Sequence, residues 1–172
     1  MCIRDSNNGD LNTSIIKTTY GKTIMVQWDE TSPRPYSRHN LIQGTKGILA
    51  GFPTRVALDG GVEGITKNHH SWAQGDDLEK LYEKYDHPLY KRIGEEARRM
   101  GGHGGMDFIM RFRIVECLLQ LTPLDQNVYE GCFLSAVTPL SADSIASDGA
   151  PQIFPDFTRG NWVDTLGLKV IS

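Results

Sequence analysis

Four glycines surround a single histidine at residues 101–105, and this turn is the best candidate in the chain for the wall of a binding site. Glycine loses more backbone freedom on folding than any other residue, so such a run indicates positive φ angles or a close backbone approach. The turn delivers His103 and several backbone N–H groups to the start of an apolar helix, where the helix dipole is positive. The alternative is a flexible connection that carries a surface or capping histidine.

A second candidate is the proline-rich stretch at residues 31–38, TSPRPYSR. Its two prolines fix φ at their own positions and favour extended geometry in the residues before them. The stretch therefore predicts a stiff connection that displays Arg34, Tyr36 and Arg38, side chains suited to sugar or phosphate groups. In the alternative interpretation the Tyr36 ring packs against the protein and the arginines face water.

Metal chemistry has little support in the sequence. His69 and His70 are adjacent in a polar loop, but no Cys, Asp or Glu stands at ligand spacing, and neighbouring side chains usually diverge. Cys2, Cys117 and Cys132 are odd in number and widely spaced, so they indicate neither a disulfide framework nor a metal cluster.

Composition limits the classes of function. With 172 residues, 39% hydrophobic and 23% charged, the chain has the size and balance of one soluble globular domain. A net charge of −3 without a long basic run argues against a nucleic-acid partner. No apolar run approaches the roughly 18 residues that a membrane span needs. The chain also lacks a dinucleotide-binding G-x-G-x-x-G after a strand, a P-loop and a G-x-S-x-G elbow.

The elements that must position these residues follow from hydrophobic periodicity. Strands are predicted at 11–19, 22–29, 40–43, 47–51 and 55–58. Because no helix separates them, they predict a largely antiparallel sheet. Helices are predicted from 76 or 77 to 85, from 88 onward, over 106–121 and over 127–144. We expect the third of these to be buried, and we expect Pro139 to kink or end the fourth.

Six stretches in register resemble one family: GDLNT at 9–13, TSPRPYSR at 31–38, GTKG at 44–47, LYEKYDHPL at 81–89, GGHGGMDF at 101–108 and PDFTRG at 155–160. In this order they resemble the C-terminal part of the family 109 glycoside hydrolases. These are NAD-dependent α-N-acetylgalactosaminidases within the superfamily of glucose–fructose oxidoreductase, inositol dehydrogenase and MocA. The resemblance covers residues 9–162, nearly the whole chain.

The resemblance implies an NAD-dependent redox route to glycoside hydrolysis. NAD in an N-terminal Rossmann domain oxidises the sugar at C3, which acidifies the C2 proton; elimination, water addition and re-reduction then complete the reaction. The resemblance also implies an α+β fold for the C-terminal part, an open, mostly antiparallel sheet with helices packed on one face. The inner side of that sheet closes the pocket for terminal N-acetylgalactosamine, and its outer face makes a homo-oligomer.

Little of the family's functional set carries over to this chain. Tyr36 matches a substrate-binding tyrosine, while Arg34, Arg38 and His103 lie in matching motifs and are assigned to the sugar pocket from their chemistry. The NAD-binding glycines and the catalytic residues of the family fall upstream of Gly9. We therefore predict that residues 1–8 are a foreign leader and turn. Residues 9–172 are then a partial C-terminal domain without its Rossmann domain, and the fragment alone is inactive.

Two other functions stay open. One is a fragment of an NAD(P)-dependent sugar dehydrogenase of the same superfamily, which would release NADH at each turnover. The other is a non-catalytic module that acts in oligomerisation through its sheet. Bacterial relatives are often exported, so the resemblance favours a periplasmic location, with the cytoplasm as the alternative.

Overall fold

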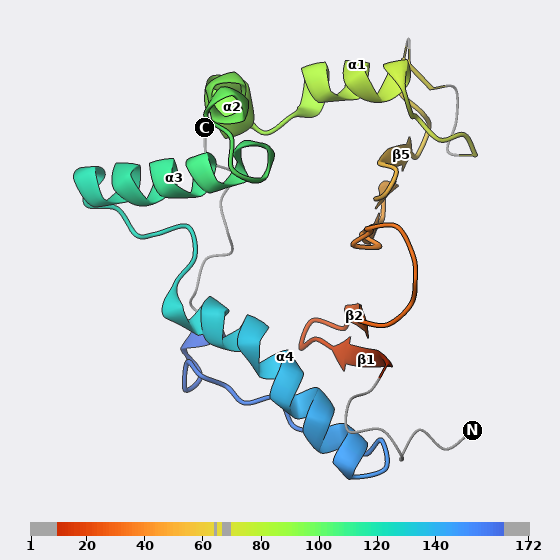
Figure 1. The fold of residues 1–172 in the computed structure, drawn as a ribbon, viewed down its shortest axis with the longest axis vertical. Helices are drawn as coiled ribbons and strands as arrows, with labels where there is room; N and C mark the ends of the chain where they lie inside the picture. The colour runs from red at the N-terminus through yellow and green to blue at the C-terminus, as the bar shows by residue number, and fades with distance from the viewer. Residues whose placement is uncertain (1–9, 64, 67–69, 164–172) are drawn as a thin grey trace. The chain divides into compact units, whose positions relative to one another are not determined.

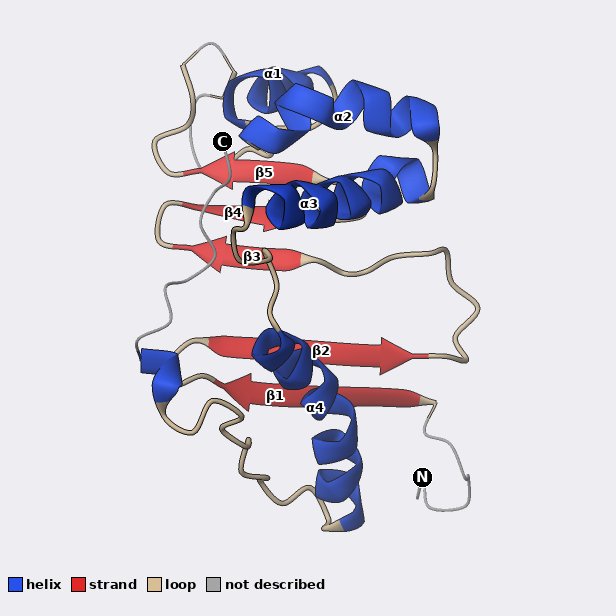
Figure 2. Ribbon diagram, turned by 90° about the vertical axis from the view of Figure 1, so that its left-hand side faces the viewer, coloured by secondary structure: helices blue, strands red, loops and turns tan. Residues whose placement is uncertain are grey.

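The computed structural model describes residues 10–63, 65–66 and 70–163. The chain divides into two compact units, residues 1–38 and residues 39–172. Within the described residues the fold is α+β, as predicted, with two small antiparallel sheets and four α-helices (Figures 1 and 2). The predicted leader at residues 1–8 and the candidate ligand His69 lie outside the described residues.

The first unit is built around a β-hairpin. Strand β1 (Leu11–Lys17) pairs antiparallel with β2 (Thr23–Asp29) along their whole length. Gly21 turns the chain with φ +77°, and the Thr18 hydroxyl accepts a hydrogen bond from the Lys22 backbone N–H at 3.0 Å. A left-handed glycine at such a turn matches the twist of the flanking strands, so the predicted hairpin is confirmed.

The apolar face of β2 is more exposed than its alternating pattern predicts. Such an alternation is typical of a strand with one packed face, yet Ile24, Val26 and Trp28 are 38–62% exposed. A two-stranded hairpin has no second layer on either face, and burial of one face needs further strands or a helix.

The second unit begins with a three-stranded sheet of β3 (Leu41–Gly44), β4 (Gly47–Ala50) and β5 (Arg55–Leu58). Each strand pairs antiparallel with the next in chain order. All five strands appear where predicted, but they hydrogen-bond as sheets of two and three strands rather than as one. The proline-rich stretch lies between β2 and β3 in the chain, and its prolines lack the N–H that a ladder hydrogen bond needs.

A small core lies between this sheet and helix α1 (Asp76–Tyr85). The cluster consists of Val62, Ala73 and Leu81, with Val56, Leu58 and Ile65 packed against it. Val56 and Ala73 exchange two backbone hydrogen bonds of 3.1 and 2.8 Å, which fasten the loop to the edge of β5. Leu81 packs one turn of α1 against that edge.

Helices α2 (Pro88–Met100) and α3 (Met106–Gln120) follow and contact each other (Figure 1). Pro88 occupies the first turn of α2, where a missing N–H costs nothing, and His87 caps the helix by accepting the Leu89 N–H on its ring nitrogen. The short 3-10 turn η2 (His103–Gly105) joins the two helices. The predicted glycine-rich turn and both helices are therefore confirmed.

The prediction that α3 is a buried helix is wrong for most of its length. Cys117 is 1% exposed, but Val115 and Leu119 on the predicted apolar face are 54% and 80% exposed. Its apolar residues occupy most of the helix circumference, whereas the described contacts of α3 with other elements are to α2 and η2. One neighbouring helix covers only one stripe of such a surface.

Helix α4 (Val128–Ala146) starts at a capping box, in which Asn127 and Glu130 satisfy each other's backbone N–H groups. Pro139 does not end the helix, since α4 continues past it for seven more residues, to Ala146. The other predicted outcome, a kink at Pro139, stays a prediction. A proline removes one hydrogen bond, and the surrounding turns of a long helix hold the rest. The Phe133 ring on α4 contacts Phe154 and Phe157, with centroids at 5.8 and 5.4 Å.

Candidate functional site

The proline-rich stretch of the first unit is anchored at its start by Asp29, the last residue of β2. The Asp29 carboxylate accepts the backbone N–H groups of Thr31 and Ser32 at 3.3 and 3.0 Å. Its other oxygen lies 3.3 Å from Arg34 Nε. These hydrogen bonds, led by the Ser32 backbone N–H, together with the nearby Arg34 lower the pKa of Asp29. The carboxylate therefore holds the chain that leads to Tyr36.

Tyr36 and Arg38 form the far end of this stretch. Arg38 Nε donates a 2.6 Å hydrogen bond to the Tyr36 hydroxyl, and the guanidinium carbon lies 5.8 Å from the centre of the tyrosine ring. The Tyr36 side chain is 73% exposed, so the alternative in which its ring packs into the protein is not what the structure shows. The arrangement presents a phenol and a cation together at the surface.

The glycine-rich turn in the second unit is shaped by close backbone packing. A Cβ added at Gly105 would lie 2.7 Å from the Ala97 carbonyl carbon in α2, and one at Gly102 would lie 2.9 Å from an Asp107 oxygen. Both glycines have positive φ, and His103 adopts φ +49° between them. A side chain at Gly105 would force the turn away from α2, and one at Gly102 would displace the Asp107 carboxylate, which explains glycine at these two positions.

His103 is bonded to Asp107, one turn into α3. Its Nδ1 lies 3.2 and 3.0 Å from the two oxygens of the carboxylate. Arg111 also stands four residues from Asp107, a spacing that allows side-chain pairing on a helix. The glycine-rich turn brings His103 back over the start of α3, so the Asp107 carboxylate bonds the histidine ring.

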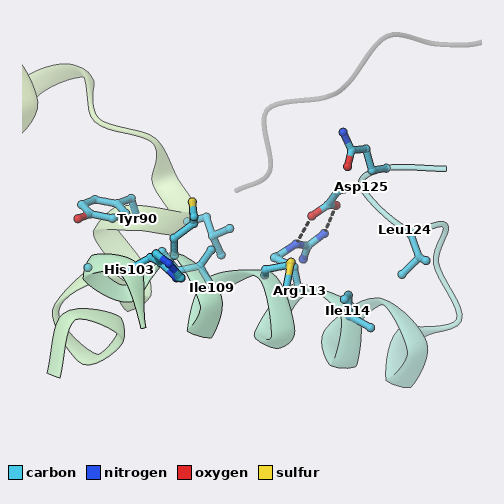
Figure 3. A pocket seen from close by; sticks show the side chains of 12 residues that line it. Tyr90, His103, Ile109, Arg113, Ile114, Leu124 and Asp125 are labelled. Carbon is cyan, nitrogen blue, oxygen red and sulfur yellow. Dashed lines mark hydrogen bonds and ion pairs between the residues drawn. The ribbon is translucent and has the colours of Figure 1, made fainter. Parts of the chain in front are cut away.

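An open pocket of about 770 Å³ runs along α3 in this unit (Figure 3). Tyr90 and His103 lie at one end of it, and Arg113 and Asp125 lie together at the other. The apolar part of the lining consists of Leu89, Met106, Ile109, Met110, Ile114 and Leu124. Mixed apolar walls with a few polar groups are the usual make-up of a ligand pocket.

The Arg113 and Asp125 pair holds the α3–α4 connection against α3. Arg113 donates from Nε and from a terminal nitrogen to the two Asp125 oxygens at 2.8 and 2.6 Å. Arg113 also pairs with Glu116, whose carboxylate accepts a further bond of 3.0 Å from Arg92 in α2. Hydrogen bonding to Arg113 lowers the pKa of Asp125, and hydrogen bonding to Asp125 raises that of Arg113.

The residues predicted for one sugar pocket therefore fall into two groups. Tyr36 and Arg38 contact each other in the first unit, and Arg34 is tied to Asp29 in the same stretch. His103 belongs to the second unit and lines the pocket along α3. Sequence reasoning missed Asp29 and Asp125 as supports of these two segments.

Two kinds of site are in question among the described residues, a dinucleotide site at the glycine-rich turn and a cluster of metal ligands. The glycine-rich turn joins two helices, whereas a dinucleotide site needs a strand before the glycine loop, so this turn does not fit NAD. In the described part of the chain, no three His, Cys, Asp or Glu side chains gather as metal ligands. Within the same residues, none of the helices is long and apolar enough to cross a membrane.

Comparison with known proteins gives the ancestry of this arrangement. The family model for "Glycosyl hydrolase 109, C-terminal domain" matches residues 4–164. The chain belongs to glycosyl hydrolase family 109. The resemblance carried by the six motifs is thus confirmed for residues 4–164.

Curated members of glycosyl hydrolase family 109 show how much of a whole protein this chain represents. It is 62% identical over 164 residues to Glycosyl hydrolase family 109 protein 1 of Akkermansia muciniphila, covering 95% of this chain and 34% of that protein. It is 56% identical over 163 residues to a family 109 protein of Shewanella amazonensis, covering 95% and 35%. The chain therefore spans about a third of the length of these relatives.

Proposed function

We propose that the whole protein that carries this chain hydrolyses terminal α-linked N-acetylgalactosamine with NAD as its cofactor. In this proposal the chain supplies part of the sugar pocket through Tyr36, with Arg34, Arg38 and His103 as the other contributing side chains. Membership of a glycosyl hydrolase family supports a carbohydrate substrate. The sugar, the linkage and the cofactor come from the resemblance of the six motifs.

The arrangement of Tyr36 and Arg38 carries this proposal. The exposed phenol accepts a hydrogen bond from Arg38 Nε at 2.6 Å, which fixes the hydroxyl in space. A phenol that accepts one hydrogen bond can still donate another. The ring adds a flat apolar surface, on which the C–H groups of a sugar can pack. Tyr36 can thus bind a sugar both through its hydroxyl group and through the face of its ring.

The remaining members of the proposed site support this point. Arg34 acts through Asp29, which fixes the start of the stretch, so we assign Arg34 a positioning role beside Tyr36. The resemblance assigns NAD to a Rossmann domain outside this chain. Homo-oligomerisation through the sheet face stays a prediction. Periplasmic export, with the cytoplasm as the alternative, stays a prediction.

Kinetics of a Tyr36→Phe variant of the intact protein on an aryl α-N-acetylgalactosaminide test the role of this chain. The variant keeps the ring and loses the hydroxyl. The transition-state stabilisation calculated from the ratio of the two kcat/KM values should therefore fall by about 0.5–1.5 kcal/mol. Tyr20→Phe is the matched control, because Tyr20 is a similarly exposed tyrosine in the hairpin turn of the same unit. Unchanged kinetics for Tyr36→Phe would remove Tyr36 from the site.

A further inference from the structure

The His103–Asp107 pair has a defined hydrogen-bonding direction. A carboxylate only accepts, so the Nδ1 atom that faces both Asp107 oxygens carries the proton. In the neutral imidazole the other ring nitrogen, Nε2, then holds the lone pair and is an acceptor. Asp107 thereby selects one tautomer of His103, as carboxylates do for histidines that bind metals or act in catalysis.

The placement of this pair depends on backbone packing rather than on the histidine side chain. Gly105 lies against the Ala97 backbone, and Gly102 leaves room for the Asp107 carboxylate. The His103 side chain itself is 75% exposed and that of Asp107 is 36% exposed. Removing either side chain therefore leaves the contact between the turn and α2 in place, so function can be separated from folding.

The surroundings of His103 suit a sugar. His103 lines one end of the pocket along α3 beside Tyr90, whose hydroxyl accepts a 3.1 Å hydrogen bond from Arg98 Nε (Figure 3). Met106 and Ile109 supply apolar wall next to these polar groups. A pyranose has apolar C–H faces and a rim of hydroxyl groups, and a pocket with both kinds of lining matches both.

We propose that His103 Nε2 accepts a hydrogen bond from a hydroxyl group of the sugar substrate, and that Asp107 is the positioning residue that makes Nε2 the acceptor. This inference rests on the proposed function and deepens it. It assigns the histidine a defined atom and direction, and it adds Asp107 to the site. Hydroxyl recognition at Nε2 requires the tautomer that Asp107 selects.

Calorimetric titration of the intact protein tests this assignment with N-acetylgalactosamine and its 3-, 4- and 6-deoxy derivatives as probes. His103→Ala should raise the Kd of N-acetylgalactosamine by about 2- to 13-fold, the net worth of one neutral hydrogen bond. For the one deoxy derivative that lacks the contacted hydroxyl, His103→Ala and wild type should bind equally. His103→Gln serves as a second variant if His103→Ala folds poorly.

Asp107→Ala should show the same selectivity among the deoxy sugars, and the double variant should bind no more weakly than His103→Ala alone. Such non-additivity shows that Asp107 acts through His103, which a purely structural role would not produce. Glu96→Gln is the matched control, because Glu96 forms an exposed ion pair with Arg99 on α2 and should leave every Kd unchanged.

Two results overturn the inference. One is an unchanged Kd for N-acetylgalactosamine in His103→Ala, and the other is an equal loss for all four sugars. Both are distinguishable from failure of the proposed function, because titration measures sugar binding without turnover. A wild-type protein that binds the sugar in this pattern but leaves aryl α-N-acetylgalactosaminides intact would refute the proposed function while upholding the His103 contact.

Discussion

Arg34 Nε lies 3.3 Å from an Asp29 carboxylate oxygen, and this ion pair joins the end of strand β2 to the proline-rich stretch that presents Tyr36. The Asp29 side chain is 5% exposed, whereas Tyr36 is 73% exposed. A shielded carboxylate thus holds one end of a stiff segment, and the exposed phenol stands near the other. The geometry at Tyr36 depends on Asp29.

Replacement of Asp29 should therefore impair sugar hydrolysis, although Asp29 itself is not proposed to contact the sugar. Asp29→Ala removes the acceptor of two backbone N–H groups and of Arg34, so the stretch loses its fixed start. We expect kcat/KM of the intact protein to fall by about 10-fold or more, because small misplacements of binding groups are costly. Asp10→Asn, at an exposed position before β1, is the control. Equal kinetics for Asp29→Ala and wild type would contradict a positioning role.

The same carboxylate should titrate at unusually low pH. Hydrogen bonds from Ser32 lower the pKa of Asp29, and Arg34 adds to the effect. A lowered folded pKa means that the anchor is fully present above the ordinary carboxyl value near 4 and is lost only as the pH falls through the lower folded value. NMR titration of the Asp29 carboxyl carbon measures this directly. A midpoint at or above about 4 would count against the anchor.

Local signals predicted most of the elements. Asn127 and Glu130 stand at capping-box spacing, and Pro88 marks the first turn of α2, so these helix starts were readable from neighbouring residues. At Pro139 the local signal left two outcomes open, a kink or the end of the helix. Its local effect is to weaken a helix, yet the turns on either side continue α4 to Ala146. The free-energy cost of one proline is outweighed where the other hydrogen bonds of a long helix remain.

The contacts of the candidate site were harder to predict because they depend on turns. Asp107 stands four residues from both His103 and Arg111, and only the backbone angles of the glycine run decide that it bonds His103. Arg113 and Asp125 are separated by twelve residues and a turn, a distance at which hydrophobic periodicity carries no information. Sequence motifs thus singled out Tyr36 and His103 as candidates but not the carboxylates that hold the segments around them.

The Arg113–Asp125 pair should contribute measurably to stability. Arg113 is 14% exposed and Asp125 35%, so water screens the pair only in part. Asp125→Asn should lower the free energy of unfolding by about 1–2 kcal/mol in urea titrations of the intact protein. Lys80→Gln breaks an exposed ion pair with Asp77 and should change it by less than about 0.5 kcal/mol. Equal losses for both variants would show that the bidentate geometry adds nothing.

The glycine-rich turn should tolerate substitution unequally. An alanine at Gly105 would meet the Ala97 backbone at 2.7 Å and adopt φ +100°, whereas one at Gly104 faces open space and has only the strain of φ +72°. We expect Gly104→Ala to cost about 1 kcal/mol and Gly105→Ala to cost at least about 2 kcal/mol. Thermal unfolding of the two variants compares them. Equal losses of stability in the two variants would show that the turn does not pack on α2.

The isolated 172-residue chain should be catalytically inert. In the proposed function, NAD and the catalytic residues lie outside this chain. Calorimetric titration with NAD should therefore show no binding, and an aryl α-N-acetylgalactosaminide should stay intact. Hydrolysis by the purified chain, at a rate above that of a buffer control, would place the catalytic groups within these 172 residues.

The most direct test of the proposed NAD-dependent glycosidase function is hydrolysis of an aryl α-N-acetylgalactosaminide by the intact protein, with NADH absorbance followed in the same cuvette. Release of the aryl group without net NADH is the expected result, because a redox route that ends in hydrolysis returns the cofactor to its starting state. NADH accumulation with free sugar, and no aryl release, would instead identify a sugar dehydrogenase and contradict the proposed glycosidase.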